Sequence, residues 1–203
     1  MQFRFGPTVI TVNITSSAAL LAAVCARLKA RQGFALATIN LDHLVKLQNS
    51  ASFRAAYTKQ DLVVADGNPI VWLSYLAGSP VSLVPGSDIL MPLARAAAAA
   101  GVAIALVGSS DTALETAATR LMSEIPGLFV AMRHAPAMGF DPEGTEAASI
   151  LQELAARKIG LCFIALGAPK QEAFAARGRG LAPEVGFASI GAGLDFIAGT
   201  QTR

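Results

Sequence analysis

The chain has 203 residues, 53% of them apolar, and its 16 Lys and Arg against 14 Asp and Glu leave a net charge of only +2. This composition excludes a disordered chain, and the lack of a Lys/Arg cluster argues against nucleic acid as a partner. Cys25 and Cys162 have neither Cys-x-x-Cys nor Cys/His spacing, so we expect both to be free, buried thiols.

A mean hydropathy of +0.51 raises the question of a membrane span. The longest uncharged run, residues 5–26, contains Pro7, Asn13 and several hydroxyl residues, so it predicts a strand and a capped helix, not a span or a signal peptide. Much of the apolar excess comes from 40 Ala residues, which indicate closely packed helices. We therefore expect a cytoplasmic chain that can still touch a membrane surface.

Short apolar, β-branched segments alternate with longer Ala/Leu/Glu/Arg segments, which is typical of βα units around a mainly parallel sheet. In chain order, strands are predicted at residues 9–12, 35–39, 62–65, 103–107, 128–132, 161–166 and 186–190. Helices are predicted from Ser16 or Ser17 to Lys29, from Ser87 or Asp88 to Ala100, from Asp111 to Ser123 and from Gly144 to Lys158. No repeat or linker divides the chain, so we expect one compact α/β domain over residues 1–203, Rossmann-like, with helices on both faces of the sheet.

Polar side chains gather where the predicted strands end. Five segments share this feature: residues 38–40, 65–68, 108–110, 167–172 and 191–195. In doubly wound sheets ligands bind outside the carboxyl ends of the strands, beside helix amino termini, so together the segments predict a site for a ligand that carries phosphate or sugar. Turn chemistry alone also places Gly, Asn and Ser at such positions, and that alternative stays open for each segment taken singly.

Several familiar catalytic fingerprints are absent. The chain has no Gly-x-Gly-x-x-Gly after an early strand, no Walker sequence and no Gly-x-Ser-x-Gly, which argues against dinucleotide binding, P-loop chemistry and an α/β-hydrolase nucleophile. His43 and His134 are the only histidines, so a His-based triad or a multi-His metal site is not expected. We interpret His43 as a helix-start residue and His134 as a loop residue, with a ligand contact as the alternative for each.

Asp66 is the first candidate for acid–base chemistry. It follows the apolar strand 62–65 and precedes Gly67, so one side of its carboxylate should be desolvated, which raises a carboxylate pKa and suits a general base. An Asx turn is the alternative. Farther along, Lys170 could offset diphosphate charge and Gln171 could hydrogen-bond a sugar, whereas a simple helix start after Pro169 would explain the same residues.

These segments fall into a recognisable order: Thr38-x-Asn40, Asp66-Gly67, Gly86-x-Asp88, Gly108 after an apolar strand, Gly139-Phe140, Ala165-Leu166-Gly167-x-Pro169-Lys170-Gln171-Glu172 and Gly191-x-Gly193-x-Asp195. From about residue 9 to the end, their order and spacing resemble the WecG/TagA/CpsF family of bacterial glycosyltransferases. The strand followed by Gly-x-Pro-Lys-Gln-Glu is the most specific of the motifs.

The resemblance implies an inverting transfer of a sugar from a UDP-sugar to a polyprenyl-diphosphate-linked saccharide in cell-surface polysaccharide synthesis, peripheral at the inner face of the bacterial membrane. It implies that Asp66 is the base and that helix amides, aided by Lys170, stabilise the leaving diphosphate. The substrate-binding residues it implies are Thr38, Asn40, Gly67, Asn68, Gly86, Asp88, Gly108, Arg133, Gly139, Phe140, Gly167, Pro169, Lys170, Gln171, Glu172, Gly193 and Asp195. The chain has no Asp-x-Asp and is too short for two Rossmann domains, so we expect no required cofactor or metal site. A homo-oligomer stays open.

Two departures from the family pattern set further expectations. The usual Arg before the segment 84–88 is missing, and Arg133 could replace that cation. The chain ends at Arg203, which looks like the first residue of an Arg-Ala-Pro element that begins a membrane-docking tail, so we expect the tail to be absent. Two other functions therefore stay open: a nucleotide-sugar-binding module without turnover, and another small α/β enzyme acting on a phosphorylated metabolite.

Overall fold

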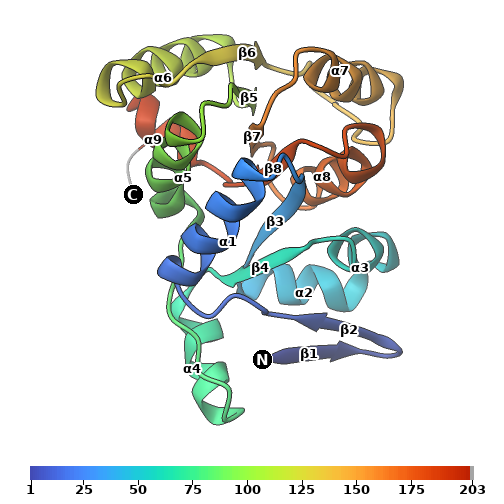
Figure 1. Cartoon of the computed structure of the whole chain (residues 1–203). Helices are drawn as coiled ribbons and strands as arrows, with labels where there is room; N and C mark the ends of the chain where they lie inside the picture. The colour runs from blue at the N-terminus through green and yellow to red at the C-terminus, as the bar shows by residue number, and fades with distance from the viewer. Residues whose placement is uncertain (202–203) are drawn as a thin grey trace.

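A parallel sheet of six strands lies at the centre of the computed structural model, which describes residues 1–201 (Figure 1). The strands are β3 (Phe34–Ile39), β4 (Leu62–Ala65), β5 (Ile104–Gly108), β6 (Val130–His134), β7 (Leu161–Ala165) and β8 (Gly186–Ser189). They lie in the order β4-β3-β8-β7-β5-β6, and every neighbouring pair is parallel. Apart from the edge strand β6, they are almost continuously buried, as expected for a sheet covered on both faces.

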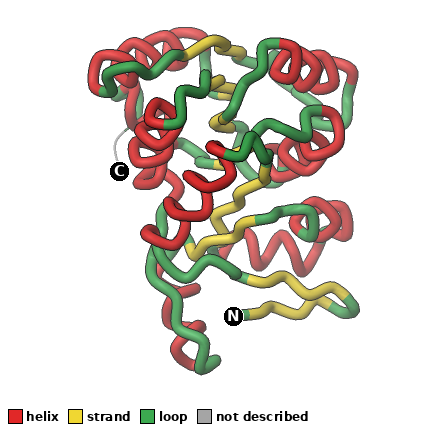
Figure 2. Tube along the Cα trace, viewed as in Figure 1, coloured by secondary structure: helices red, strands yellow, loops and turns green. Residues whose placement is uncertain are grey.

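Helices cover both faces of this sheet, which confirms the predicted fold class (Figure 2). One face carries α1 (Ser17–Lys29), α5 (Gly86–Ala99), α6 (Asp111–Glu124) and α9 (Gly193–Ala198), which share one apolar cluster. The other face carries α2 (Leu41–Asn49), α3 (Ala51–Tyr57), α7 (Thr145–Ala156) and α8 (Lys170–Leu181), packed in two further clusters. The short helix α4 (Asn68–Leu76) extends away from the sheet at one end of the molecule (Figure 1).

The observed bounds differ from the predicted ones mainly at turns. The predicted strand 128–132 is Val130–His134, because Gly127 adopts φ of +79° and pairing with β5 begins only at Val130. The predicted helix cap Asp111 is wrong by one residue, since the Ser110 hydroxyl accepts the bond from Ala113 N at 3.3 Å. His134 ends β6 and does not lie in a loop.

The amino-terminal segment contains one strand more than predicted. β1 (Gln2–Phe5) pairs antiparallel with β2 (Thr8–Thr11), whereas the sequence pattern indicated only a strand at residues 9–12. Ser16 caps α1 as expected, with its hydroxyl 3.2 Å from Ala19 N. Within residues 1–201 the helices are all too short or too polar to cross a bilayer.

The centre of the sheet contains a topological switch point. β3 and β8 are neighbours, yet the chain leaves β3 toward α2 on one face and leaves β8 toward α9 on the other. A crevice therefore opens at their carboxyl ends, the place where open α/β sheets bind their ligands. Four of the five polar segments that the sequence placed at strand ends border this crevice or its immediate neighbourhood.

Candidate functional site

A pocket of about 320 Å³ occupies the crevice at the carboxyl ends of β3, β4, β7 and β8. It is lined by Thr38, Asn40, Asp42, His43, Asp66, Gly86, Ser87, Gly167, Ala168, Gln171, Ile190, Gly191, Ala192 and Phe196. Its lining is dominated by small residues and by hydroxyl, amide and carboxyl groups. Such a lining lets a ligand approach the backbone closely while polar side chains fix its orientation.

Asp66 lies at the mouth of this pocket, and backbone groups of β3 and α5 hydrogen-bond to it. Its N–H donates to Ile39 O at 2.8 Å, which extends the β3–β4 ladder by one residue. Gly67 follows with φ of +128°, a conformation that favours glycine, and it turns the chain into α4. The N–H of Gly86, the first residue of α5, donates to Asp66 Oδ2 at 3.4 Å. The amino end of a 14-residue helix thus faces the carboxylate and stabilises negative charge there.

Asn40 and His43 form the side of the pocket next to β3. The Asn40 side chain accepts a hydrogen bond from His43 N at 3.0 Å and thereby caps α2. The His43 ring is buried and its Nδ1 lies 2.8 Å from Tyr57 Oη. Burial lowers the pKa of His43 to about 4, so its ring is neutral near pH 7.

Lys46 links this side to the turn after β7. Its Nζ donates to Asp42 Oδ2 at 2.6 Å and to the carbonyl of Ala168 at 3.2 Å. Ala168 belongs to the turn that precedes α8 and lines the pocket. Lys46 therefore fixes that turn against α2 and places a cation at the edge of the pocket.

Gln171 closes the site from the amino end of α8. Its Oε1 accepts from Gly191 N at 3.2 Å and its Nε2 donates to Glu172 Oε1 at 2.8 Å. Glu172 is completely buried, and burial raises the pKa of its carboxyl to about 7. Three buried oxygens have no hydrogen-bond partner within the described part of the chain: Gln60 Oε1, Glu172 Oε2 and Ser189 Oγ. Glu172 thus orients Gln171 from below the pocket, without lining it.

The structure brings only some of the expected site residues into the pocket. Those that line it are Thr38, Asn40, Asp66, Gly86, Gly167 and Gln171. Those within two residues of a lining residue in the chain are Gly67, Asn68, Asp88, Pro169, Lys170, Glu172, Gly193 and Asp195. Of these, Asn68 begins α4 and Asp88 lies exposed in the first turn of α5, whereas Gly193 is buried against Ile190 and Leu90.

Lys170 and Arg133, which were expected to face the diphosphate, do not line this pocket. Lys170 lines a hollow on the outer side of α8, together with Lys59 and Arg177. Arg133 is exposed on the edge strand β6 and lines a third hollow beside α7. Lys170 is the first residue of α8, and it is the next residue, Gln171, that faces the pocket. Arg133 lies on β6, which is an edge strand of the sheet, away from the pocket.

The remaining expected residues have structural surroundings. Phe140 is buried in the core against Phe174, with ring centroids 6.0 Å apart, and Gly139 is exposed in the preceding turn. Gly108 allows β5 to approach β7, since a Cβ there would lie 2.2 Å from Ala165 O. The Asp195 carboxylate accepts from Ser109 Oγ at 2.5 Å, so the segments after β5 and β8 bind each other.

Nothing in the sequence indicated Lys46, which does not line the pocket but contacts two residues that do, Asp42 and Ala168. It stands in the polar pattern of an amphipathic helix and belongs to no motif, so only the fold reveals that Ala168 lies beside it. His43 was interpreted as a helix-start residue, which is correct for its backbone. Its burial beside the pocket could have been inferred only by recognising that α2 follows a switch-point strand.

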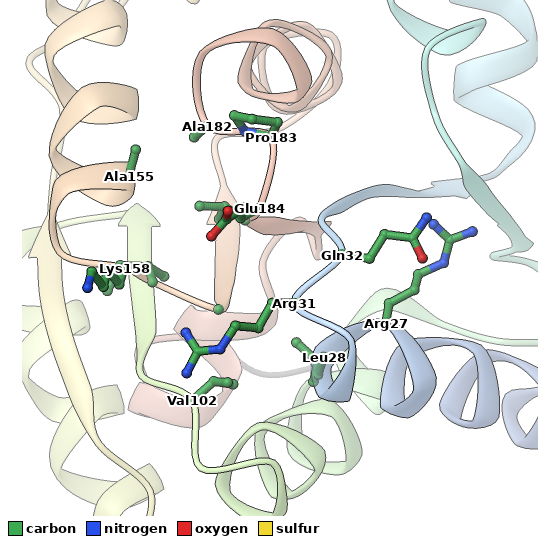
Figure 3. Close-up of a pocket in the computed structure, with 13 residues that line it drawn as sticks. Arg27, Leu28, Arg31, Gln32, Val102, Ala155, Lys158, Ala182, Pro183 and Glu184 are labelled. Atoms are coloured by element: carbon green, nitrogen blue, oxygen red, sulfur yellow. The ribbon is translucent and has the colours of Figure 1, made fainter.

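A larger hollow of about 530 Å³ lies at the opposite end of the sheet (Figure 3). Val102, Gly160 and Val185, which line it, come just before β5, β7 and β8. Arg31 and Lys158 reach it from the ends of α1 and α7, with Glu184 nearby (Figure 3). These three charged side chains are exposed and make no ion pair within residues 1–201.

The part of the chain that the structure describes contains no group of three or more His, Cys, Asp or Glu arranged to hold a metal ion. Cys162 is buried and free, and Cys25 is free and half-buried. Arg203, the residue expected to begin a tail element, lies outside the described residues.

Comparisons with known proteins agree with the motif pattern. A family model described as the glycosyl transferase WecG/TagA/CpsF family matches residues 7–203. An N-acetylglucosaminyldiphosphoundecaprenol N-acetyl-beta-D-mannosaminyltransferase of Bacillus spizizenii is 24% identical over 174 residues, which are 85% of this chain and 65% of the relative. The chain thus spans slightly less than two thirds of the length of that relative.

Proposed function

We infer that the chain, which belongs to the WecG/TagA/CpsF family of glycosyl transferases, transfers a sugar from a UDP-sugar to a saccharide linked to a lipid diphosphate. The observation that carries this proposal is the pocket at the switch point. There Asp66, Thr38 and Gln171 meet, beside the amino ends of α5 and α8. The family and the printed name of the Bacillus relative support the substrate class.

In the proposed reaction, Asp66 accepts the proton of the acceptor hydroxyl as its oxygen attacks the anomeric carbon. The new carbon–oxygen bond forms while the bond from the anomeric carbon to the diphosphate breaks, and UDP leaves from the opposite face with the electron pair. The anomeric configuration is therefore inverted. Helix amino ends at the pocket stabilise the negative charge of the leaving diphosphate.

The remaining side chains of the pocket position the reactants. Thr38 and Asn40 offer a hydroxyl and an amide on the β3 side, and Gln171 offers its amide from α8. Lys46, rather than Lys170 or Arg133, supplies the cation nearest the pocket among these three, because its Nζ lies 3.2 Å from Ala168 O. The proposed transfer needs no divalent metal, in line with the lack of Asp-x-Asp.

The acceptor lipid places the reaction at the inner face of the cell membrane, where the protein would act as a peripheral protein.

The test incubates the chain with UDP-N-acetylhexosamines or UDP-hexoses and a diphosphate-linked saccharide, with and without EDTA. We expect UDP release, a glycosylated product of inverted configuration and no loss of rate with EDTA. UDP binding without product would favour a binding module, and absence of a UDP-dependent thermal shift would indicate a different phosphorylated ligand.

A further inference from the structure

The segment directly after Asp66 has an unusual composition for a protein surface. From Gly67 to Ser87 the chain contains 21 residues and no Asp, Glu, Lys, Arg or His. This segment contains the whole of α4 and the irregular return to α5. A charge-free surface segment of this length favours a partner that is itself apolar.

Most of the large apolar side chains of α4 face outward. The exposed fractions are 65% for Trp72, 68% for Tyr75 and 85% for Leu76, whereas Ile70 and Ser74 are buried. Figure 1 shows α4 at one extreme of the molecule, extending away from the sheet. Side chains that a globular protein normally buries are therefore exposed on this projecting helix, and Trp72, Tyr75 and Leu76 are together called the tip.

The tip has a fixed shape. The Ser74 hydroxyl donates to Val71 O at 2.6 Å and accepts from Val81 N at 3.0 Å. The return segment is also tied to the sheet, because Val84 N donates to Ala65 O at 2.7 Å. These bonds hold α4 and its return as one projection beside Asp66.

The exposed area is small for a protein partner. Large side chains of this kind bury about 150–250 Å² each, so the tip offers on the order of 500 Å². A stable dimer buries roughly 800 Å² on each partner, so this tip alone is too small for a second copy of the chain. Trp and Tyr flanked by Leu, without charges, are instead typical of side chains at the boundary between lipid headgroups and hydrocarbon.

We propose that α4 and its return segment dock the protein on a lipid bilayer by inserting Trp72, Tyr75 and Leu76 into its surface. The inference rests on the proposed function, because a lipid-linked acceptor diphosphate lies at that surface. A helix of nine residues is about 13 Å long. The headgroup layer is roughly 5–8 Å thick, so an inserted tip leaves Asp66, two residues before α4, on the aqueous side near the acceptor diphosphate.

The first experiment uses Trp72 as its own reporter, since it is the only tryptophan of the chain. Vesicles of phosphatidylcholine, without acceptor, are added to the chain in large lipid excess. We expect a blue shift of the tryptophan emission and protection from an aqueous quencher, both unchanged at high salt because the tip carries no charge. An unchanged emission at saturating lipid overturns the proposal, and so does a shift that depends on protein concentration without lipid and accompanies dimers in sedimentation.

The second experiment compares two variants. Tyr75→Ser/Leu76→Ser keeps the Trp72 reporter and removes two apolar side chains, so vesicle partitioning should weaken at least about tenfold. Phe129→Ser is the control, because Phe129 is 63% exposed and directly precedes β6, a strand that lies far from α4 in Figure 1. The control should partition like the unmodified chain, and thermal melts of both variants check that they fold. Equal partitioning of the double variant and the control contradicts the proposal.

Turnover separates this inference from the proposed function. With a water-soluble acceptor the double variant should react as fast as the unmodified chain, whereas with an acceptor embedded in vesicles it should react more slowly. If the unmodified chain turns over neither acceptor but Trp72 still enters vesicles, the proposed function fails and the docking stands. If the variant reacts normally on vesicles, the docking inference fails and the function stands.

Discussion

The two ends of the sheet differ in kind, although both are hollowed. The hollow at the amino ends is larger, about 530 Å³ against about 320 Å³ for the pocket at the carboxyl ends. Its charged residues, among them Arg31, Lys158 and Glu184, project into solvent from helix ends and loops. At the carboxyl ends, by contrast, Gln171 and His43 are buried and held by hydrogen bonds from other elements.

The larger of the two hollows is therefore not the one whose polar side chains are fixed by the fold. Chemistry requires groups that stay within a fraction of an ångström of their working positions, and only groups fixed by neighbouring elements do so. The topological switch supplies that fixation, because β3 and β8 send α2 and α9 to opposite faces. Within residues 1–201, none of the polar side chains that line the hollow at the amino ends is buried.

The largest effect is expected from a matched pair of acidic substitutions, one at each end of the sheet. Asp66→Asn should lower turnover by about 10²- to 10⁴-fold, because the acceptor hydroxyl loses its base. Glu184→Gln at the amino-end hollow should leave turnover unchanged. Steady-state rates and UDP thermal shifts measure both, and Asp66→Asn should still bind UDP. Turnover near the unmodified rate in Asp66→Asn would remove Asp66 from the role of base.

A pair of amide substitutions should give the next largest effect. Gln171→Leu removes the partner of Gly191 N and of the Glu172 carboxyl, so turnover should fall roughly 10- to 100-fold and the melting temperature should drop. Gln32→Leu changes an exposed amide at the amino-end hollow and should alter neither quantity. A thermal melt and a kinetic assay on each variant test this. Equal losses in both variants would show that the two ends are equivalent.

A pair of lysine substitutions should give a smaller effect. Lys46→Ala loses the contacts to Asp42 and to the Ala168 carbonyl, but the Lys46 side chain is 38% exposed. Partly exposed ion pairs contribute about 0–1 kcal/mol, so KM for the UDP-sugar should rise up to about fivefold. Lys158→Ala at the other end should leave KM unchanged. A rise in KM for Lys158→Ala alone would place the nucleotide at the amino ends.

The sequence predicted the sheet well because its strands are buried on both faces. Such strands are continuous apolar runs, and the runs that became β3, β4, β7 and β8 were located to within a residue or two. The hairpin strand β1 was missed, since Gln2–Phe5 alternates polar and apolar residues in an exposed setting and pairs only with β2. The local sequence pattern therefore predicts strands reliably where both faces are buried, and poorly where a strand is exposed.

The site was predictable only as far as strand ends determine it. Thr38 lies near the end of β3, and Asn40, Asp66 and Gln171 follow strands whose ends meet, so their convergence could be inferred from the α/β pattern alone. Gln171 lines the pocket and Lys170 lines a different hollow, because successive residues of a helix point about 100° apart. Which side chain of a helix start faces the pocket depends on packing that the sequence does not display.

The two ends of the sheet also differ in one buried acid, Glu172, which lies below the pocket at the carboxyl ends of the strands. Burial raises the pKa of Glu172 from 4.5 to about 7 in the folded protein, so the native state keeps a proton that the unfolded chain loses. The resulting stability is fully present below about pH 4.5 and is lost as the pH rises through about 7. His43 has the opposite effect, because burial lowers its pKa from 6.5 to about 4 in the folded protein. The unfolded chain therefore binds a proton before the native state does, and stability is lost as the pH falls from 6.5 through 4.

Glu172→Gln should therefore raise the free energy of unfolding at pH 8 and change it little at pH 5. Gln can still accept the bond from Gln171 Nε2, so turnover should stay close to the unmodified rate, the smallest kinetic effect in the series. A pKa difference of this size corresponds to a few kcal/mol, on the order of 1.4 kcal/mol per pH unit. Urea unfolding at both pH values measures it, with Glu184→Gln at the exposed hollow as control. Parallel pH profiles for Glu172→Gln and the unmodified chain would mean that Glu172 is ionised in the native state, and the buried carboxyl would then need a cationic partner close to its Oε2 oxygen.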